Sequence, residues 1–248
     1  MNQRGLQLIA AFGLLTRLPV WRITSQSPTD FNRSIWAFPI VGGVVGAIAG
    51  LAYLAAHRLG LPILLAAIWT LAIQLWLTGA LHEDGLADTA DGFGGGHTPE
   101  RKLDIMRDSR IGSYGALALI LALAIRATAI ATIAAPWPVL LSLTLAGTGA
   151  RAAILIVLQA TGAARPDGMA AGLGRSPWPE AITGLGVAVV LGACILPLPR
   201  LLLLATVTTA IALAMAGIAR RQIGGHTGDV LGATAALTEC VTLSLLTL

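Results

Sequence analysis

Seven apolar segments, each about long enough to cross a bilayer, dominate this sequence. A membrane-spanning helix needs about 20 predominantly apolar residues. Apolar residues make up 56% of the chain and charged residues only 11%, whereas soluble domains carry about 25% charged residues. The sequence therefore predicts an all-α fold, a polytopic membrane helical bundle of about seven transmembrane helices, in one domain covering 1–248. The predicted spans are 36–57, 62–81, 113–135, 138–160, 181–198, 200–218 and 230–248.

An eighth apolar piece, residues 6–20, precedes these spans. Arg17 interrupts it and Pro19 ends it, so it is too short to cross the bilayer comfortably. A signal peptide is the alternative, but no small-residue cleavage site follows. We therefore expect an N-terminal re-entrant or interfacial helix.

Basic residues are divided unequally between the two sides of the predicted bundle. Twelve Lys and Arg residues fall on one side, and only Arg58 and Arg200 fall on the other. Positive residues concentrate on the cytoplasmic side, so we expect a multi-pass protein of the cytoplasmic (inner) membrane whose polar chemistry faces the cytoplasm. No basic run or RNA-binding motif accompanies this charge, and we expect no nucleic-acid partner. The predicted cytoplasmic active-site loops are about 82–112, 161–180 and 219–230.

Three charges lie inside the predicted spans. Arg126, Arg151 and Glu239 each sit roughly 15–18 Å below the cytoplasmic loops, at 1.5 Å per helical residue. Unpaired, each would cost several kcal/mol in lipid. We therefore predict that Glu239 neutralises Arg126 or Arg151; the alternative is that the arginines reach the membrane surface.

Residues 81–112 carry seven of the twelve acidic residues of the chain. In HEDGLADTADG, Asp84, Asp88 and Asp91 stand at i, i+4 and i+7, on one face of a helix that we expect to continue directly from 62–81. Like charges at this spacing repel, and a divalent cation removes the repulsion. Oxygen ligands favour Mg²⁺ or Mn²⁺. His82 and Glu83 lie off this face, and a solvated helix end is the simpler alternative.

Glycines and basic residues follow the aspartates. Thr98 and Pro99 predict a helix start, and the segment GFGGGHTPERKLDIMRDSR contains Arg107 and Arg110. Carboxylate-held Mg²⁺ beside arginines is typical of phosphoryl transfer. Two other predicted loops bring further candidates, although Thr227 alone could be a simple helix cap. These candidates are Arg165, Asp167, Thr227 and Asp229.

These motifs together resemble the signature of the cobalamin synthase family, the adenosylcobinamide-GDP ribazoletransferases. The main match is HEDGLADTADGFGGG followed by ERKLDIMRDSRIGSYGALAL. Further matches run along the whole chain in order: FGLLTRLPV, FPIVGGVVGAIAG, ARPDGM and GGHTGDVLGATAALTE. Glu83 departs from the family pattern, which favours an apolar residue at that position.

The resemblance implies a Mg²⁺-dependent transferase. It would join adenosylcobinamide-GDP to α-ribazole, or to α-ribazole 5′-phosphate, and release GMP in a late step of cobalamin biosynthesis. The implied metal ligands are Asp84, Asp88 and Asp91, and the implied catalytic residues are Asp84, Asp88 and Asp108. We expect substrate binding by Arg107, Ser109, Arg110, Arg151, Arg165, Asp167, Thr227 and Asp229.

The expected partners are the two substrates and membrane lipid, with another copy of the chain or other cobalamin-assembly enzymes as protein partners. Two other functions stay open on the residues alone. A CDP-alcohol or prenyl-type lipid transferase also places aspartates and Mg²⁺ at the membrane surface, but the CDP-alcohol spacing is absent. A membrane transporter would use Arg126, Arg151 and Glu239 to line a path across the bilayer.

Overall fold

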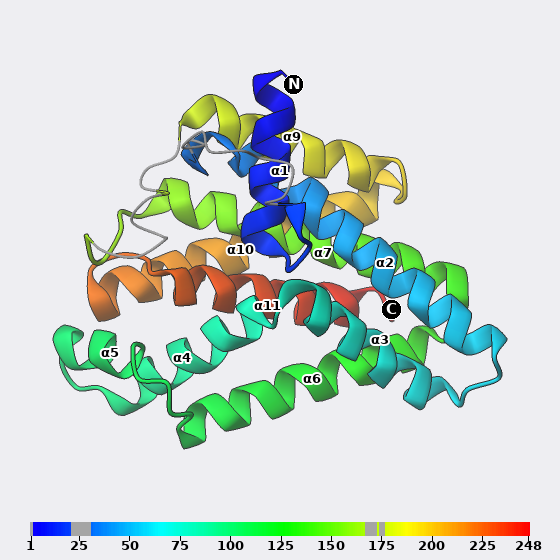
Figure 1. The fold of residues 1–248 in the computed structure, drawn as a ribbon, viewed down its shortest axis with the longest axis horizontal. Coiled ribbons are helices and arrows are strands. Elements are labelled where there is room, and N and C mark those ends of the chain that lie inside the picture. Colours follow the sequence, from blue (N-terminus) through cyan, green and yellow to red (C-terminus); the bar gives the residue numbers. More distant parts are fainter. Residues whose placement is uncertain (1, 21–30, 167–172, 174–176) are drawn as a thin grey trace.

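The computed structural model describes residues 2–20, 31–166, 173 and 177–248, and its regular elements are helices. Most of the long helices run in roughly the same direction, and one N-terminal helix crosses them (Figure 1). The prediction of an all-α helical bundle is confirmed. The helices are α1 (Gln3–Leu15), α2 (Phe38–Arg58), α3 (Ile63–Thr78), α4 (Leu81–Gly95), α5 (Pro99–Ile105), α6 (Ser113–Ile133), α7 (Pro136–Ala160), α9 (Trp178–Ala193), α10 (Leu198–Ile223) and α11 (Gly228–Leu245), with 3-10 turns η2 (Phe31–Arg33) and η3 (Ile35–Ala37) before α2.

Each of the seven predicted spans contains a helix, but fewer than seven of these helices qualify as spans. Among the described residues, four are long and apolar enough to cross a membrane, or five if the bent pair α3–α4 counts as one span. Helix α9 has only 16 residues. Helix α11 packs against α4, α6, α7 and α10, so it is enclosed by protein and tolerates Glu239 and several threonines. By length and composition, the described residues thus contain four or five candidate spans, where the sequence predicted about seven.

Glycines hold α2 and α7 in close contact. A Cβ on Gly46 would overlap the Leu143 carbonyl group, and a Cβ on Gly42 would overlap the carbonyl of Gly147. Small residues at such positions let two membrane helices approach until their backbones touch. This contact fixes α7, which carries Arg151, against α2.

Helices α3 and α4 meet at an angle of 89°. Gly79 and Ala80 both have positive φ angles, 65° and 57°, and the left-handed Gly79 ends α3. The backbone N–H of Arg17 donates to the carbonyl of Leu77 at 2.8 Å, which ties the chain just after α1 to this bend. The expectation that the helix of segment 62–81 continues straight into the aspartates was wrong, because the chain turns sharply before them.

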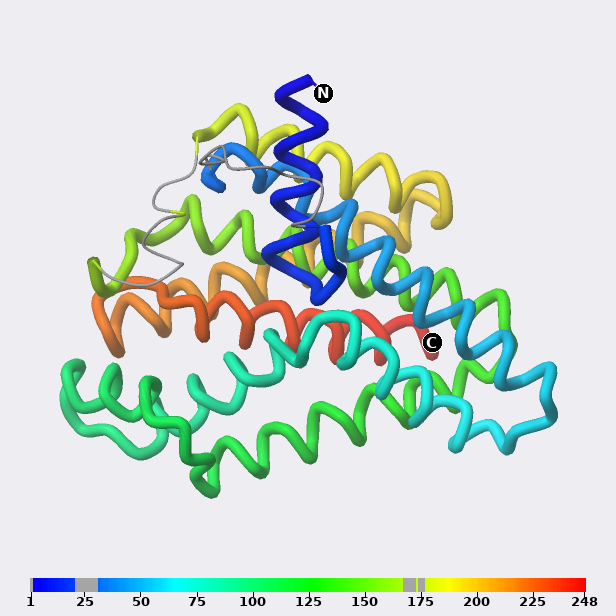
Figure 2. The backbone as a smooth tube through the Cα atoms, in the orientation of Figure 1, coloured from blue at the N-terminus to red at the C-terminus, as the bar shows by residue number. Residues whose placement is uncertain are grey.

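Helix α1 has 13 residues and ends at Leu15, with Thr16 as its C-cap. It contacts α2, η2 and η3 and runs across the long helices in Figure 2. The helix predicted at 6–20 is therefore present in shorter form, and its position relative to a membrane stays a prediction.

Three connections gather at one end of the bundle, on the left in Figure 2. They are residues 96–112, 161–166 and 224–227, and this end is called the site end below. Helix α2 ends and α10 begins at the opposite end, with Arg58 and Arg200 both exposed. The predicted active-site loops therefore lie together, insofar as the structure describes them.

Candidate active site

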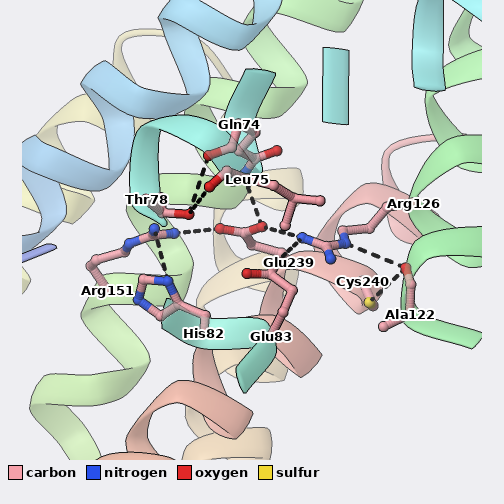
Figure 3. Close-up of polar contacts among 10 residues, drawn as sticks. All are labelled: Gln74, Leu75, Thr78, His82, Glu83, Ala122, Arg126, Arg151, Glu239 and Cys240. Carbon is pink, nitrogen blue, oxygen red and sulfur yellow. Dashed lines mark hydrogen bonds and ion pairs between the residues drawn. The ribbon is translucent and has the colours of Figure 1, made fainter. Parts of the chain in front are cut away.

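An ion network lies inside the bundle (Figure 3). Arg126 on α6 has its Nη1 3.1 Å from Oε2 of Glu239 on α11, and Arg151 on α7 contacts Oε1 of the same carboxylate. Each arginine side chain is only 1% exposed. The prediction that Glu239 neutralises one arginine is confirmed, and the structure shows that it contacts both.

Glu83 supplies the second negative charge of this network. Its Oε1 lies 2.8 Å from Arg126 Nη1, so two carboxylates face two guanidinium groups. Glu83 was expected to lie off the face of the three aspartates, and the structure places it against Arg126 in the interior. The bend before α4 sets the direction of this helix, and α4 then packs against α6, which carries Arg126. A sequence signal was present, since Arg126, Arg151 and Glu239 alone leave an unbalanced positive charge.

Gln74 and His82 extend the network. Gln74 Nε2 donates to Glu239 Oε2 at 3.0 Å, and Arg151 Nη2 lies 3.4 Å from His82 Nδ1. Arg151, predicted to bind substrate, is thus placed deep in the bundle, where it contacts Glu239 and His82. Sequence reasoning gave little weight to His82 and none to Gln74, because neither is charged.

The three aspartates of α4 do not point to one place. Asp91 accepts a hydrogen bond from the backbone N–H of Gly112 at 2.7 Å and another from that of Gly115 at 2.9 Å. Gly112 is the N-cap residue of α6 and, as a glycine, has no side chain that could cap the helix. Asp91 therefore caps α6 from a neighbouring helix, and both of its oxygens are engaged.

Asp84 and Asp88 lie instead near the start of α11. Asp88 is within electrostatic reach of Asp84, Asp229, Asp91 and Arg165. The approach of α4 to α11 depends on Gly85, since a Cβ there would lie 2.7 Å from the carbonyl oxygen of Asp229. Tertiary packing thus brings together carboxylates that are about 140 residues apart in the chain.

The start of α11 and the loop after α7 are joined by backbone hydrogen bonds. His226 N–H donates to the Gly162 carbonyl at 2.9 Å, and Ala164 N–H donates to the His226 carbonyl at 2.8 Å. Arg165 is thereby placed so that its Nη2 lies 3.2 Å from Asp229 Oδ2. Within the described part of the chain, the other terminal nitrogen of Arg165, Nη1, is buried without a hydrogen-bond partner.

Thr227 and Asp229 occupy the first turn of α11. Thr227 is the N-cap residue, accepts from the backbone N–H of Val230 at 3.3 Å, and donates to Asp229 Oδ2 at 3.1 Å. Burial raises the pKa of Asp229, although Thr227 and Arg165 act in the opposite direction. Thr227 is therefore a cap, as the simpler interpretation held, and it also positions a carboxylate of the candidate site.

A cavity of about 210 Å³ opens beside these carboxylates. It lies between α4 and α11, with α7, the end of α1 and the start of α2 completing its walls. Its polar lining residues are His82, Asp84 and Asp229, and most of its other side chains are leucines or similar apolar groups. The cavity is thus apolar with one polar end.

The predicted Asp108–Arg110 element lies on the exposed connection between α5 and α6. Arg110 Nη2 donates to Asp108 Oδ2 at 2.6 Å, and the Arg110 backbone N–H donates to Oδ1 at 3.1 Å. These hydrogen bonds lower the pKa of Asp108 to about 2. Arg107 and Ser109 are exposed on the same connection. The structure thus places this element outside the lining of the cavity. The hydrogen bonds between Arg110 and Asp108 join residues of the element to each other.

Asp167 lies outside the described residues. Within the ranges that are described, no group of three or more His, Cys, Asp or Glu side chains is arranged to hold a metal ion. The metal site at Asp84, Asp88 and Asp91 therefore stays a prediction, and the hydrogen bonds of Asp91 favour a smaller ligand set.

The fold and this site define a helical membrane protein with a carboxylate-lined cavity near one end of its bundle. The family model described as cobalamin-5-phosphate synthase matches residues 7–247. The chain therefore belongs to the cobalamin-5-phosphate synthase family. The resemblance seen in the sequence is confirmed, and with it the prediction of a transferase of cobalamin biosynthesis.

Curated relatives cover nearly the whole chain. A protein of Bradyrhizobium diazoefficiens, named adenosylcobinamide-GDP ribazoletransferase, is 45% identical over 242 residues, which are 96% of this chain and 91% of that protein. Proteins of the same name from Brucella ovis and Brucella canis are each 40% identical over 243 residues, 94% of both chains. No solved structure matches the chain.

Proposed function

We propose that this chain joins adenosylcobinamide-GDP to α-ribazole, or to α-ribazole 5′-phosphate, and releases GMP. The observation that carries this proposal is the convergence of Asp84 and Asp88 on α4, Asp229 on α11 and Arg165 in the loop after α7, beside a cavity that Asp84 and Asp229 line. Carboxylates that hold a metal, next to a guanidinium group with an unused N–H, suit transfer of a phosphoryl group. The names of the curated relatives supply the substrates.

The carboxylates fit a magnesium ion. Mg²⁺ is usually held by one or two carboxylates together with substrate phosphates and water, and seldom by a cage made of protein alone. Asp84 and Asp88 provide two carboxylates near each other, and Asp229 lies close by. We propose Asp84 and Asp88 as the ligands, because Asp91 already accepts two backbone N–H groups. When bound, the ion would neutralise the phosphate oxygens during transfer.

The reaction forms one P–O bond and breaks another. A ribazole hydroxyl attacks the phosphorus attached to cobinamide, the bond from that phosphorus to the bridging oxygen breaks, and GMP leaves. The hydroxyl proton must be removed, and Asp84 lines the cavity where its carboxylate can accept that proton. Arg165 can donate from Nη1 to a phosphate oxygen, since that nitrogen has no partner within the described residues.

We further propose that the site end faces the cytoplasm and that the protein lies in the inner membrane. The unequal distribution of basic residues supports this orientation, because Arg58 and Arg200 lie at the opposite end. Cys194 offers a test: it is exposed after α9, at the end away from the site. An impermeant maleimide should label Cys194 in right-side-out vesicles, whereas an Arg101→Cys, Cys194→Ser variant should be labelled only in inverted vesicles. The reverse pattern would contradict the orientation.

The activity is tested with purified protein in liposomes, supplied with adenosylcobinamide-GDP, α-ribazole and Mg²⁺. GMP release and the corrinoid product should appear together and stop when the metal is chelated. Asp84→Asn should lose about 100-fold or more in kcat, as expected for loss of an essential charged group. Glu100→Gln, an exposed carboxylate change on α5, is the matched control and should keep full activity.

No GMP release from folded wild-type protein would contradict the proposed reaction. A lipid transferase should instead transfer a phosphoryl or prenyl group to a lipid acceptor in the same liposomes. A transporter should move labelled substrate across the liposome membrane without forming GMP.

A further inference from the structure

The cavity beside Asp84 has two chemically different parts. Its apolar wall comes from five helices or segments and consists mainly of Leu14, Leu15, Phe38, Ile154, Leu173 and Leu231. Its polar end holds His82, Asp84 and Asp229. Among the described lining residues, His82 is the one with a side-chain nitrogen, so the cavity offers two carboxylate acceptors and a single imidazole.

Arg151 fixes which ring nitrogen of His82 carries the proton. A guanidinium group only donates hydrogen bonds, and Arg151 Nη2 lies 3.4 Å from His82 Nδ1. Nδ1 must therefore accept, and the proton of the neutral imidazole sits on Nε2. Glu239 holds Arg151 from the other side, so the ion network sets the tautomer of His82.

The Nε2 atom of His82 is ready to donate to a ligand. The side chain is only 4% exposed, and Nε2 has no hydrogen-bond partner within the described part of the chain. In Figure 3 no drawn contact reaches this nitrogen, and His82 is one of the residues that line the cavity. A buried N–H without a partner costs free energy, and a ligand acceptor in the cavity would remove that cost.

We propose that this cavity binds the aromatic base of the ribazole nucleoside, with His82 Nε2–H donating to the unsubstituted ring nitrogen of the base. This assignment rests on the proposed function. A benzimidazole is planar and apolar with one acceptor nitrogen, which matches an apolar wall with one donor. The ribose hydroxyls then lie toward Asp84 and Asp229, where the reaction takes place.

Neither part of the other substrate fits this cavity as well. A corrinoid ring system is far larger than about 210 Å³. A diphosphate suits the proposed metal and Arg165 at the polar end, but not the apolar wall that makes up most of the cavity, because burial of an anion among apolar side chains is costly. The ribazole base is therefore the occupant that the size and the donor set favour.

An analogue of the nucleoside tests the hydrogen bond directly. In an indole riboside with the same ring substituents, a C–H group replaces the acceptor nitrogen and the shape is almost unchanged. Wild-type protein should bind α-ribazole about tenfold or more tightly than this analogue, because the analogue leaves the His82 N–H unpaired. Equilibrium dialysis without the corrinoid substrate measures both dissociation constants.

Substitution of His82 should abolish that preference. His82→Leu should bind α-ribazole and the indole riboside within about twofold of each other, since neither can then form the bond. In turnover, the KM for α-ribazole should rise by about tenfold or more, whereas the KM for adenosylcobinamide-GDP should stay unchanged. His82→Gln, whose amide can donate, should recover part of the preference. A merely structural role of His82 would not change the ratio of the two ligands.

A second variant leaves the ion network intact. Ile154→Phe puts a larger side chain in the apolar wall and so reduces the volume of the cavity. The change should weaken α-ribazole binding by about tenfold and leave the KM for the corrinoid substrate unchanged. Ala188→Leu is the matched control, because it fills a separate apolar cavity of about 270 Å³ between α7, α9 and α10. It should change neither KM.

The outcomes separate this inference from the proposed function. Equal affinity of the wild-type protein for the two ribosides would overturn the inference, even if GMP is released normally. The same holds if His82→Leu and Ile154→Phe raise the KM for adenosylcobinamide-GDP and leave that for α-ribazole unchanged. Absence of GMP release together with a clear preference for α-ribazole in dialysis would count against the proposed reaction and support the base site.

Discussion

The guanidinium group of Arg126 on α6 lies 2.8 Å from the carboxylate of Glu83 on α4. This ion pair fixes the bent helix α4 to a membrane-spanning helix. Because α4 also carries Asp84 and Asp88, the pair helps to determine where these carboxylates stand relative to α11. A charged contact inside the bundle is thereby coupled to the geometry of the candidate site.

Loss of one partner of this pair should destabilise the protein strongly. Glu83→Gln leaves Arg126 with the Glu239 carboxylate that Arg151 also uses, so we expect a loss of about 3–5 kcal/mol in the free energy of unfolding. Thermal unfolding in detergent measures the change. The exposed change Glu100→Gln is the control. Glu83→Leu combined with Arg126→Leu should recover much of the loss, because no unpaired charge is left inside the bundle. Equal stability of Glu83→Gln and the control would show that the pair contributes little.

Asp91 should matter for the start of α6 more than for metal binding. Asp91→Ala removes the acceptor for the Gly112 and Gly115 N–H groups, and loss of a helix cap costs about 1 kcal/mol. Hydrogen exchange at Gly112 and Gly115 should therefore become faster.

The metal dependence of the same variant gives a second measurement. The Mg²⁺ concentration for half-maximal activity should change by less than about threefold in Asp91→Ala and rise by about tenfold or more in Asp84→Asn, if Asp84 is a ligand and Asp91 is not. Asp104→Ala, an exposed aspartate on α5, provides the baseline. A large rise in Asp91→Ala would restore Asp91 to the ligand set.

The contact between α2 and α7 should not tolerate even one added methyl group. Gly46→Ala places a Cβ against the Leu143 carbonyl, and overpacking of this kind typically costs about 1–3 kcal/mol. Gly217→Ala on α10 is the matched control, since a Cβ there meets nothing within 4 Å; the change should be neutral or slightly stabilising. Unfolding midpoints of the two variants in the same detergent decide the point, and similar values would argue against a backbone contact.

Asp108 should remain ionised well below neutral pH. Its pKa is lowered from 3.8 to about 2, chiefly by the hydrogen bonds from Arg110. The pKa is lower in the folded than in the unfolded chain, so the contribution of this pair is fully present above pH 3.8 and is lost as the pH falls through about 2. Arg110→Gln should raise the pKa of Asp108 toward 3.8, measured from the carboxyl ¹³C shift. No rise would mean that the side-chain contact does not persist in solution.

The local patterns of the sequence predicted much of this protein. Apolar segments of membrane length indicated a helical bundle, and the paired Thr98 and Pro99 marked the start of α5, where Thr98 accepts from the Arg101 N–H at 3.3 Å. The charge of Arg126 and Arg151 within apolar segments required a buried carboxylate, and Glu239 meets that requirement. These inferences succeed because hydropathy, capping and charge balance depend on residue type and on short spacings.

The orientation of α4 was decided only by the tertiary structure. Periodicity places Asp84, Asp88 and Asp91 on one face of an isolated helix, but it does not show that the chain turns by 89° just before them. After that turn, Glu83 faces Arg126, Asp91 faces the start of α6, and Asp84 faces the cavity.

The sequence by itself therefore determined the kind of protein and supplied the residues that are proposed to carry its chemistry. The tertiary structure decided which of these residues meet, because contacts such as His82 with Arg151 and Asp229 with Arg165 join positions 69 and 64 residues apart. Local spacing in the sequence carries no information on contacts between positions so far apart. They form only when packing of glycines such as Gly85 against α11 lets the helices approach closely enough.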